Sequence, residues 1–128
     1  MNAFLSLGRY LFPIAFIVFG IFHMMNGPVM AEYVVPAYMP AKIVWVYLSG
    51  AGLILGGLSM YLGKYDKLAA TLLSVFLLLL ILMVHLPGAM AGGEGAQNSI
   101  TMILKDLAMM SACMLYAQNL AKDRSIIG

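Results

Sequence analysis

Four long apolar runs, separated by shorter polar or glycine- and proline-rich segments, make up most of the chain. They cover approximately residues 7–25, 43–62, 68–86 and 99–120. Each run is close to the roughly 20 residues that an α-helix needs to cross the hydrocarbon core of a bilayer. The pattern therefore predicts an all-α fold, a single integral membrane domain over residues 1–128 built as a four-helix bundle.

The segments between the runs predict how the helices are connected. Residues 63–67, GKYDK, are long enough only for a tight turn, so the second and third helices should form an antiparallel hairpin, with Asp66 capping the third helix. Residues 26–42 carry three prolines and suit an extended loop at the lipid head groups, where it could act as a lid. Residues 89–98 are rich in glycine and predict a flexible connector, whose last residue or Ser99 would cap the fourth helix.

Composition places these helices in lipid rather than in water. Hydrophobic residues make up 63% of the 128 residues and charged residues only 9%, which leaves too little polar surface to cover a soluble globule. The net charge of +2 is small and spread along the chain, so we expect no nucleic-acid partner. The single cysteine, Cys113, excludes an intramolecular disulfide and dithiol redox chemistry.

The distribution of basic residues predicts the orientation of the bundle. One side, which the chain ends share with the turn at residues 63–67, carries Arg9, Lys64, Lys67, Lys122 and Arg124, whereas the loops opposite carry only Lys42. We therefore predict that both termini face the cytoplasm (N-in/C-in), with Arg9, Lys64 and Lys67 as topology anchors. The protein would then be a multi-pass protein of the bacterial cytoplasmic (inner) membrane.

The first apolar run also has an alternative interpretation. Arg9 precedes it, and Val29-Met30-Ala31 resembles the small-residue site at which signal peptides are cleaved. Residues 1–31 would then be a secretory signal instead of a permanent helix.

Two adjacent charges in the fourth run need an explanation, because charges are costly inside a bilayer. Lys105 and Asp106 lie about 9 Å into the helix when counted from Ser99 at about 1.5 Å per residue. Adjacent side chains on a helix point roughly 100° apart, so these two should not form a good mutual pair. Each is expected to find a partner on another element.

Two histidines provide candidate partners for these charges. His23 and His85 lie near the outer ends of the first and third helices, on the side where the fourth helix begins. We expect a polar pocket open toward the outside, lined by His23, His85, Lys105 and Asp106, with Glu32 from the first loop. It could bind a polar head group or relay protons, because histidine titrates near neutral pH.

A structural explanation of the same residues stays open. Lys105 could extend to the head groups, Asp106 could bond to a neighbouring helix, and both histidines could simply lie at the membrane interface. A metal site is the weakest alternative, because two histidines and a carboxylate spread over three helices have no diagnostic spacing. We therefore expect no metal.

Glycines in the second helix predict close helix packing. Gly52 and Gly56 form a GxxxG pair, and Gly57 extends the same small surface. Such surfaces let another backbone approach closely, either from the same chain or from a second copy.

Several short motifs resemble those of the DoxX-like family of small four-helix bacterial membrane proteins. They are GRY at residues 8–10, GIFH at 20–23, LGGL at 55–58, AA at 69–70 and LKDLA at 104–108. The resemblance runs over most of the chain and implies a four-helix bundle in the cytoplasmic membrane. Relatives include the membrane subunit of an archaeal thiosulfate:quinone oxidoreductase and a methylamine-utilisation maturation protein, so function transfers only by analogy. Family members often carry an acidic residue just before the Gly-Gly of the second helix, where this chain has Leu53.

Three functions are compatible with these observations. The first is a non-catalytic accessory subunit of a quinone-linked redox complex or other membrane complex, with quinone or lipid as the bound molecule and a protein as partner. Because the chain lacks a haem-ligand pair, a flavin motif and a cysteine cluster, we do not expect it to carry electrons or to act as an enzyme on its own. The second is a small homo-oligomeric carrier or channel, and the third is a purely structural or assembly subunit. None of them requires a covalent cofactor.

Overall fold

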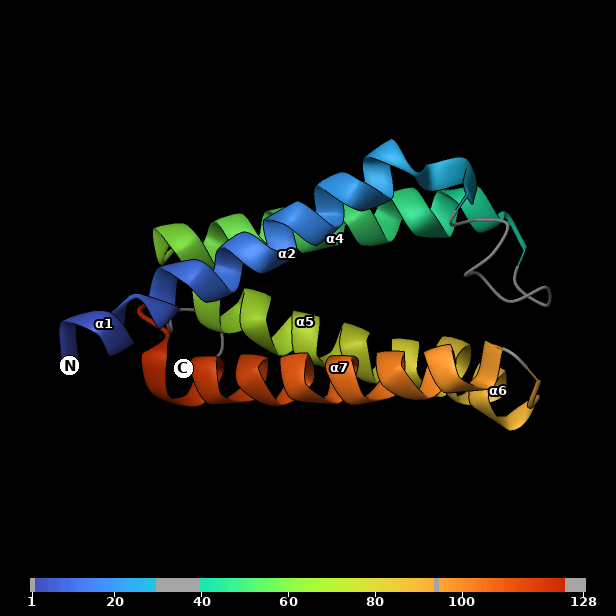
Figure 1. Ribbon diagram of the computed structural model, residues 1–128. Coiled ribbons are helices and arrows are strands. Elements are labelled where there is room, and N and C mark those ends of the chain that lie inside the picture. The colour runs from blue at the N-terminus through green and yellow to red at the C-terminus, as the bar shows by residue number, and fades with distance from the viewer. Residues whose placement is uncertain (1, 30–39, 94, 124–128) are drawn as a thin grey trace.

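The computed structural model describes residues 2–29, 40–93 and 95–123, and its elements are helices (Figure 1). In chain order they are α1 (Asn2–Ser6), α2 (Gly8–Met25), α4 (Lys42–Leu62), α5 (Asp66–Leu80), the π-helical turn η1 (Ile81–His85), α6 (Leu86–Met90), α7 (Gly95–Leu115) and the π-helical turn η2 (Tyr116–Leu120). They combine into four segments long and apolar enough to cross a membrane: Asn2–Met25, Lys42–Leu62, Asp66–Met90 and Gly95–Leu120. The predicted all-α fold with four spans is confirmed, whereas the N-in/C-in orientation stays a prediction.

The third and fourth spans are longer than the hydropathy pattern predicts. The third continues through η1 into α6, because Pro87 stands in the first turn of α6, where its missing N–H costs little. The fourth begins at Gly95, so Asn98 and Ser99 lie inside α7, and the prediction that one of them caps this helix is wrong. The glycine-rich connector is correspondingly reduced to residues 91–94.

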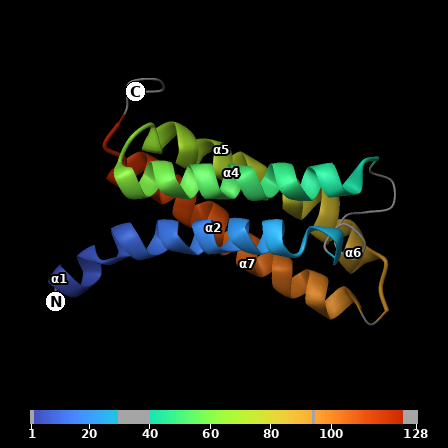
Figure 2. The ribbon, with the colours of Figure 1, turned by 90° about the horizontal axis from the view of Figure 1, so that it is seen from above.

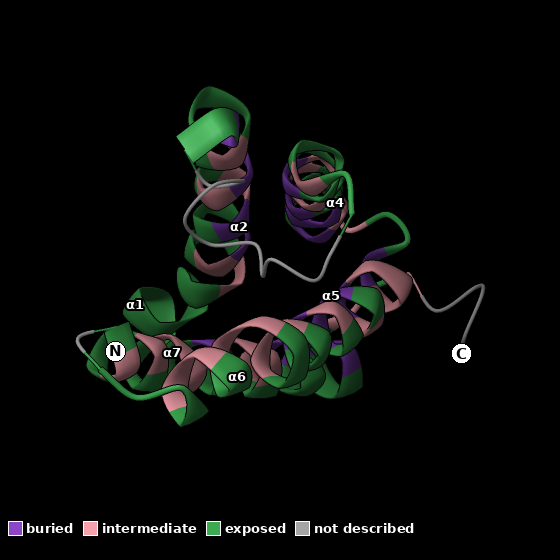
Figure 3. Cartoon of the chain, turned by 90° about the vertical axis from the view of Figure 1, so that its right-hand side faces the viewer, coloured by how far each residue is buried: buried purple, intermediate pink, exposed green. Residues whose placement is uncertain are grey.

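Two antiparallel helical hairpins pack against each other. α2 pairs with α4, and α5 pairs with α7 (Figures 1 and 2). The turn at residues 63–65 joins the hairpins, and the end-on view shows the four long helices around a common centre (Figure 3). α1 and the end of η2 lie at the same end of the bundle as this turn (Figure 1).

Glycines let α4 approach both of its neighbours. A Cβ added at Gly57 would lie 2.9 Å from the Pro13 carbonyl oxygen of α2, and one at Gly56 would lie 2.7 Å from Leu73 Cδ1 of α5. Neither position has room for a larger side chain. A Cβ at Gly52, the other member of the GxxxG pair, would meet no described atom within 4 Å, so Gly52 does not pack against another described helix of this chain.

The hydrophobic core lies in the half of the bundle near the turn at residues 63–65. Its buried members come from all four spans and are Phe16, Leu53, Met60, Ala70, Leu73, Leu77, Cys113, Tyr116 and Ala117. Two buried carboxylates flank it: Asp66 lies beside the turn, and Asp106 lies about two helical turns beyond Cys113. Because lipid is as apolar as the core, close packing and polar contacts have to stabilise such a bundle.

Candidate functional site

Asp106 is the buried charge in the middle of the fourth span. It comes 11 residues after Gly95, so it lies about 16 Å along the helix, deeper than the distance counted from Ser99 suggested. Only 2% of its surface is exposed. At this depth each charged group must be compensated by a partner or by water.

His85 and Lys105 surround this carboxylate. His85 Nε2 lies 3.1 Å from Asp106 Oδ2, and Lys105 Nζ lies 3.6 Å from Asp106 Oδ1. The sequence predicts no good mutual pair between Lys105 and Asp106, and the structure shows a loose ion pair, because the lysine stem is long enough to bring its ammonium group to 3.6 Å from the neighbouring carboxylate. Although the distance from His85 is short, Oδ2 receives no hydrogen bond of good geometry from the described residues. The imidazole and the carboxylate are therefore adjacent, without a well-aligned hydrogen bond between them.

The local helix geometry directs His85 toward α7. His85 is the last residue of η1, and η1 packs against α7. A π-helical turn holds an additional residue, which changes the directions of the side chains that follow it, and such turns are frequent at functional sites. The imidazole remains 14% exposed, so the pair of His85 and Asp106 is mostly but not completely buried.

Lys105 extends from this pair toward the first hairpin. Its side chain is 43% exposed, and Nζ lies 5.2 Å from the centre of the Phe19 ring on α2. The ring face attracts the ammonium group electrostatically. Lys105 thus contacts an aromatic ring of one hairpin while it pairs with a carboxylate of the other.

Of the five predicted site residues, three form the charged group around Asp106, and His23 has a different set of contacts. The Nδ1 atom of His23 lies 2.7 Å from the Phe19 carbonyl oxygen of its own helix. Its Cβ would be 2.8 Å from a Cβ at Gly50, so His23 packs against α4. Within the described part of the chain it has no ion pair with the others. Glu32 lies outside the described residues, as do residues 30–39 of the predicted lid.

A second polar cluster, which sequence reasoning missed, surrounds Asp66. Its Oδ2 accepts hydrogen bonds from the Lys122 backbone N–H at 2.8 Å and from the Tyr116 hydroxyl at 3.0 Å, and its Oδ1 accepts one from the Asp123 N–H at 2.8 Å. The Tyr116 hydroxyl also lies 2.9 Å from the Met60 carbonyl oxygen. The prediction that Asp66 caps its own helix is wrong, because its carboxylate instead binds the chain that leaves η2. Ionisable groups are therefore not confined to one end of the bundle.

The basic residues predicted as topology anchors lie near this second cluster. Arg9 donates a hydrogen bond from Nη2 to the Leu120 carbonyl oxygen at 2.9 Å, where η2 ends and its last carbonyls lack partners in the helix. Lys64 is in the turn, and Lys67 is in the first turn of α5. They share one end of the bundle, although the side of the membrane stays a prediction. Arg124 lies outside the described residues.

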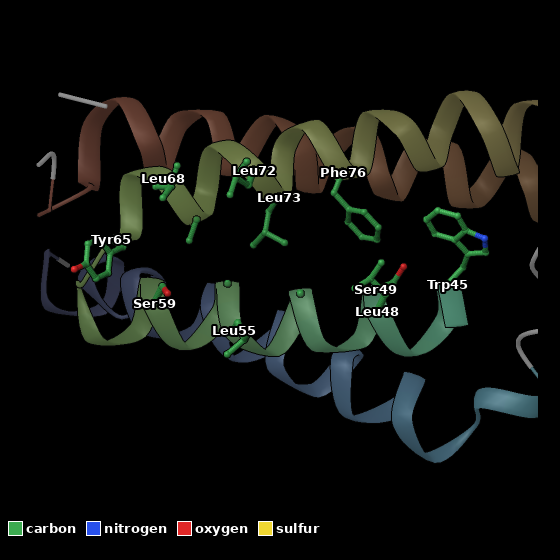
Figure 4. A pocket seen from close by; sticks show the side chains of 13 residues that line it. Trp45, Leu48, Ser49, Leu55, Ser59, Tyr65, Leu68, Leu72, Leu73 and Phe76 are labelled. Carbon is green, nitrogen blue, oxygen red and sulfur yellow. The ribbon is translucent and has the colours of Figure 1, made fainter. Parts of the chain in front are cut away.

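A groove of about 460 Å³ lies between parts of α4 and α5 (Figure 4). Trp45 lies toward one of its ends and Tyr65 toward the other. Its thirteen lining residues are almost all apolar or small, and Gly52 is one of them. The groove is therefore lined by apolar and small residues, in contrast to the charged group at Asp106.

The four apolar helices and the buried carboxylates define the class of protein: a multi-pass membrane protein with four spans and ionisable groups buried within them. The family model described as DoxX matches residues 4–86, and the chain belongs to this family, which is made up of small membrane proteins. No curated protein and no solved structure gives a match. The matched range includes His85 but ends before Lys105 and Asp106, so the family supports the fold and leaves the site to be argued from its geometry.

Proposed function

We propose that this protein is an accessory subunit of a quinone-linked redox complex in the cytoplasmic membrane of a bacterium. In this proposal His85 and Lys105 bind the quinone head group, and Asp106 positions His85. The observation that carries the proposal is a 2% exposed carboxylate about halfway along a membrane span, with an imidazole and an ammonium group beside it. Three ionisable groups at such depth are costly, and apolar side chains would pack as well without that cost.

The chemistry of this group suits a quinone. Quinones and quinols exchange protons whenever they exchange electrons, and an imidazole beside a carboxylate can accept or return a proton. Lys105 Nζ can donate a hydrogen bond to a ring oxygen, and the Phe19 ring at 5.2 Å from Nζ offers an apolar surface to the ligand's ring. A ligand reaches this place from the lipid, where quinones are dissolved.

An accessory role follows from the missing electron carrier. The chain has one cysteine and two histidines, of which His85 is paired with Asp106 and His23 with a backbone carbonyl oxygen. With a single cysteine it offers no cysteine ligand set for an iron–sulfur cluster. Electrons would pass between the quinone and a cofactor in a partner subunit, while this chain positions the ring and handles its protons.

The other two functions receive unequal support. A carrier or channel needs a polar route through the bundle, but Phe16, Leu77 and Cys113, which lie between the charged group and the turn, are at most 2% exposed. An assembly role is the second candidate, because the groove beside α4 leaves the space in front of Gly52 open. In that case a helix of another subunit would dock there.

Direct titration with a short-chain quinone tests the proposal. Decyl-benzoquinone added to the purified protein in mild detergent should bind at a single site per chain, as measured by isothermal titration calorimetry. Lys105→Met should weaken this binding by at least about tenfold, because it removes the ammonium group that donates to the ring oxygen, and this corresponds to the loss of about one hydrogen bond. The matched control is His23→Gln, which should leave the affinity unchanged. Failure of the native protein to bind, or equal weakening by both variants, would contradict the proposal.

A further inference from the structure

The position of the proton on the His85 ring follows from its neighbour. His85 Nε2 lies 3.1 Å from Asp106 Oδ2, and an ionised carboxylate oxygen can only accept hydrogen bonds. The Lys105 ammonium group lies 3.6 Å from Oδ1, so the cluster places a carboxylate beside a cation as well as beside the imidazole. Two atoms that both carry lone pairs would repel each other at this distance, so Nε2 carries the ring proton.

The other ring nitrogen, Nδ1, is then a hydrogen-bond acceptor. A neutral imidazole has one donor and one acceptor nitrogen. The side chain keeps 14% of its surface exposed, and its contact with Asp106 is made through Nε2, on the other side of the ring from Nδ1. In an apolar medium an acceptor without a donor costs free energy, so a ligand that supplies an O–H group gains affinity there.

His23 provides an internal contrast. Its Nδ1 lies 2.7 Å from the Phe19 carbonyl oxygen, which also only accepts, so here Nδ1 carries the proton. The two histidines of the chain are therefore fixed as opposite tautomers by their nearest acceptors.

We infer that the site at His85 selects a hydroxyl-bearing ring, a quinol, over the corresponding quinone. This inference rests on the proposed function and names the form of the ligand that the site takes. A quinol hydroxyl donates to His85 Nδ1, and its oxygen accepts from Lys105 Nζ. A quinone carbonyl can use only the lysine, and it places its own lone pairs against those of Nδ1. Asp106 acts as a positioning residue, because it sets the tautomer without touching the ligand.

Nitrogen NMR of the histidine rings tests the tautomers without any ligand. Protein labelled with ¹⁵N only in histidine and placed in nanodiscs should show one ring protonated at Nε2 and one protonated at Nδ1. His23→Gln should remove the signals of the Nδ1-protonated ring and leave the other set, which assigns both. A His85 ring protonated at Nδ1, or at both nitrogens, would overturn the inference while leaving the proposed function intact.

Three ligands with the same decyl chain test the selectivity under anaerobic conditions: the hydroquinone, the benzoquinone and the dimethyl ether of the hydroquinone. The hydroquinone should bind at least about tenfold more tightly than the other two, because only it carries the O–H donor. In Asp106→Asn, the side-chain amide can donate to Nε2 and move the ring proton to Nδ1. The preference for the hydroquinone should then disappear or reverse, whereas a merely structural Asp106 would change all three affinities together.

The possible outcomes separate the two claims. Binding of none of the three ligands to the native protein would contradict the proposed function itself. Equal or tighter binding of the benzoquinone would contradict only the selectivity. If Asp106→Asn does not fold, the NMR spectrum and the three affinities of the native protein still decide the inference.

Discussion

Asp66 and Asp106 are both buried carboxylates in membrane-spanning helices, but their hydrogen bonding differs. Asp66 is fully buried and accepts hydrogen bonds from the Lys122 and Asp123 backbone N–H groups and from the Tyr116 hydroxyl, at 2.8, 2.8 and 3.0 Å. Each hydrogen bond to a charged group contributes about 1.5–3 kcal/mol. This carboxylate is therefore well compensated, and it joins the start of α5 to the chain that follows η2.

Asp106 is almost as buried but much less satisfied. One of its oxygens has no hydrogen bond of good geometry from the described residues, and the ammonium group of Lys105 remains 3.6 Å from the other. A carboxylate that is present for stability would have better partners. The contrast supports a structural role for Asp66 and agrees with the positioning role that we propose for Asp106.

The largest effect on stability is expected from removing the Asp66 carboxylate. Asp66→Ala removes the acceptor of two part-buried backbone N–H groups and of the buried Tyr116 hydroxyl and disconnects the end of η2 from α5, which should cost about 3–5 kcal/mol. The measurement is the free energy of unfolding in mixed micelles, followed by circular dichroism. Ser111→Ala is the control, because among the described residues this exposed hydroxyl bonds only to the Leu107 carbonyl oxygen of its own helix. Loss of less than about 1 kcal/mol would remove the structural role of Asp66.

A smaller effect is expected from one partner of Asp66. Tyr116→Phe keeps the buried ring and removes a single hydroxyl donor, while both backbone donors to Asp66 remain. The free energy of unfolding should fall by about 1–2 kcal/mol. Tyr61→Phe is the control, because its ring is 44% exposed. An effect as large as that of Asp66→Ala would mean that the phenol, not the backbone, carries the cluster.

The pattern of apolar residues predicted the number of spans and their approximate positions. It failed at the ends of the third and fourth helices, where a proline and several glycines suggested breaks. Pro87 is tolerated because it stands in the first turn of α6, and Gly95 begins α7. Such residues weaken a helix in isolation, but packing of a long apolar segment against its neighbours can override this preference.

The candidate site was predictable only in part. Intramembrane charge pointed to Lys105 and Asp106, and depth along the helix made His85 a plausible neighbour. The Asp66 cluster escaped prediction because two of its three donors are backbone N–H groups, which leave no trace in residue types. The sequence also could not place His23, because rotation of a helix about its axis depends on packing, here on the contact between His23 and Gly50.

The smallest effect on stability, and the sharpest contrast with Asp66, is expected from Asp106→Leu. The substitution removes a buried charge that has few hydrogen bonds to lose. It leaves Lys105, whose side chain is 43% exposed and therefore does not become a fully buried unpaired charge. The free energy of unfolding should therefore change by less than about 1 kcal/mol, measured in the same micelles as Asp66→Ala, while binding of the decyl hydroquinone falls by at least about tenfold. A loss of stability comparable to that of Asp66→Ala, with ligand affinity retained, would make Asp106 a second structural carboxylate and end the distinction between the two.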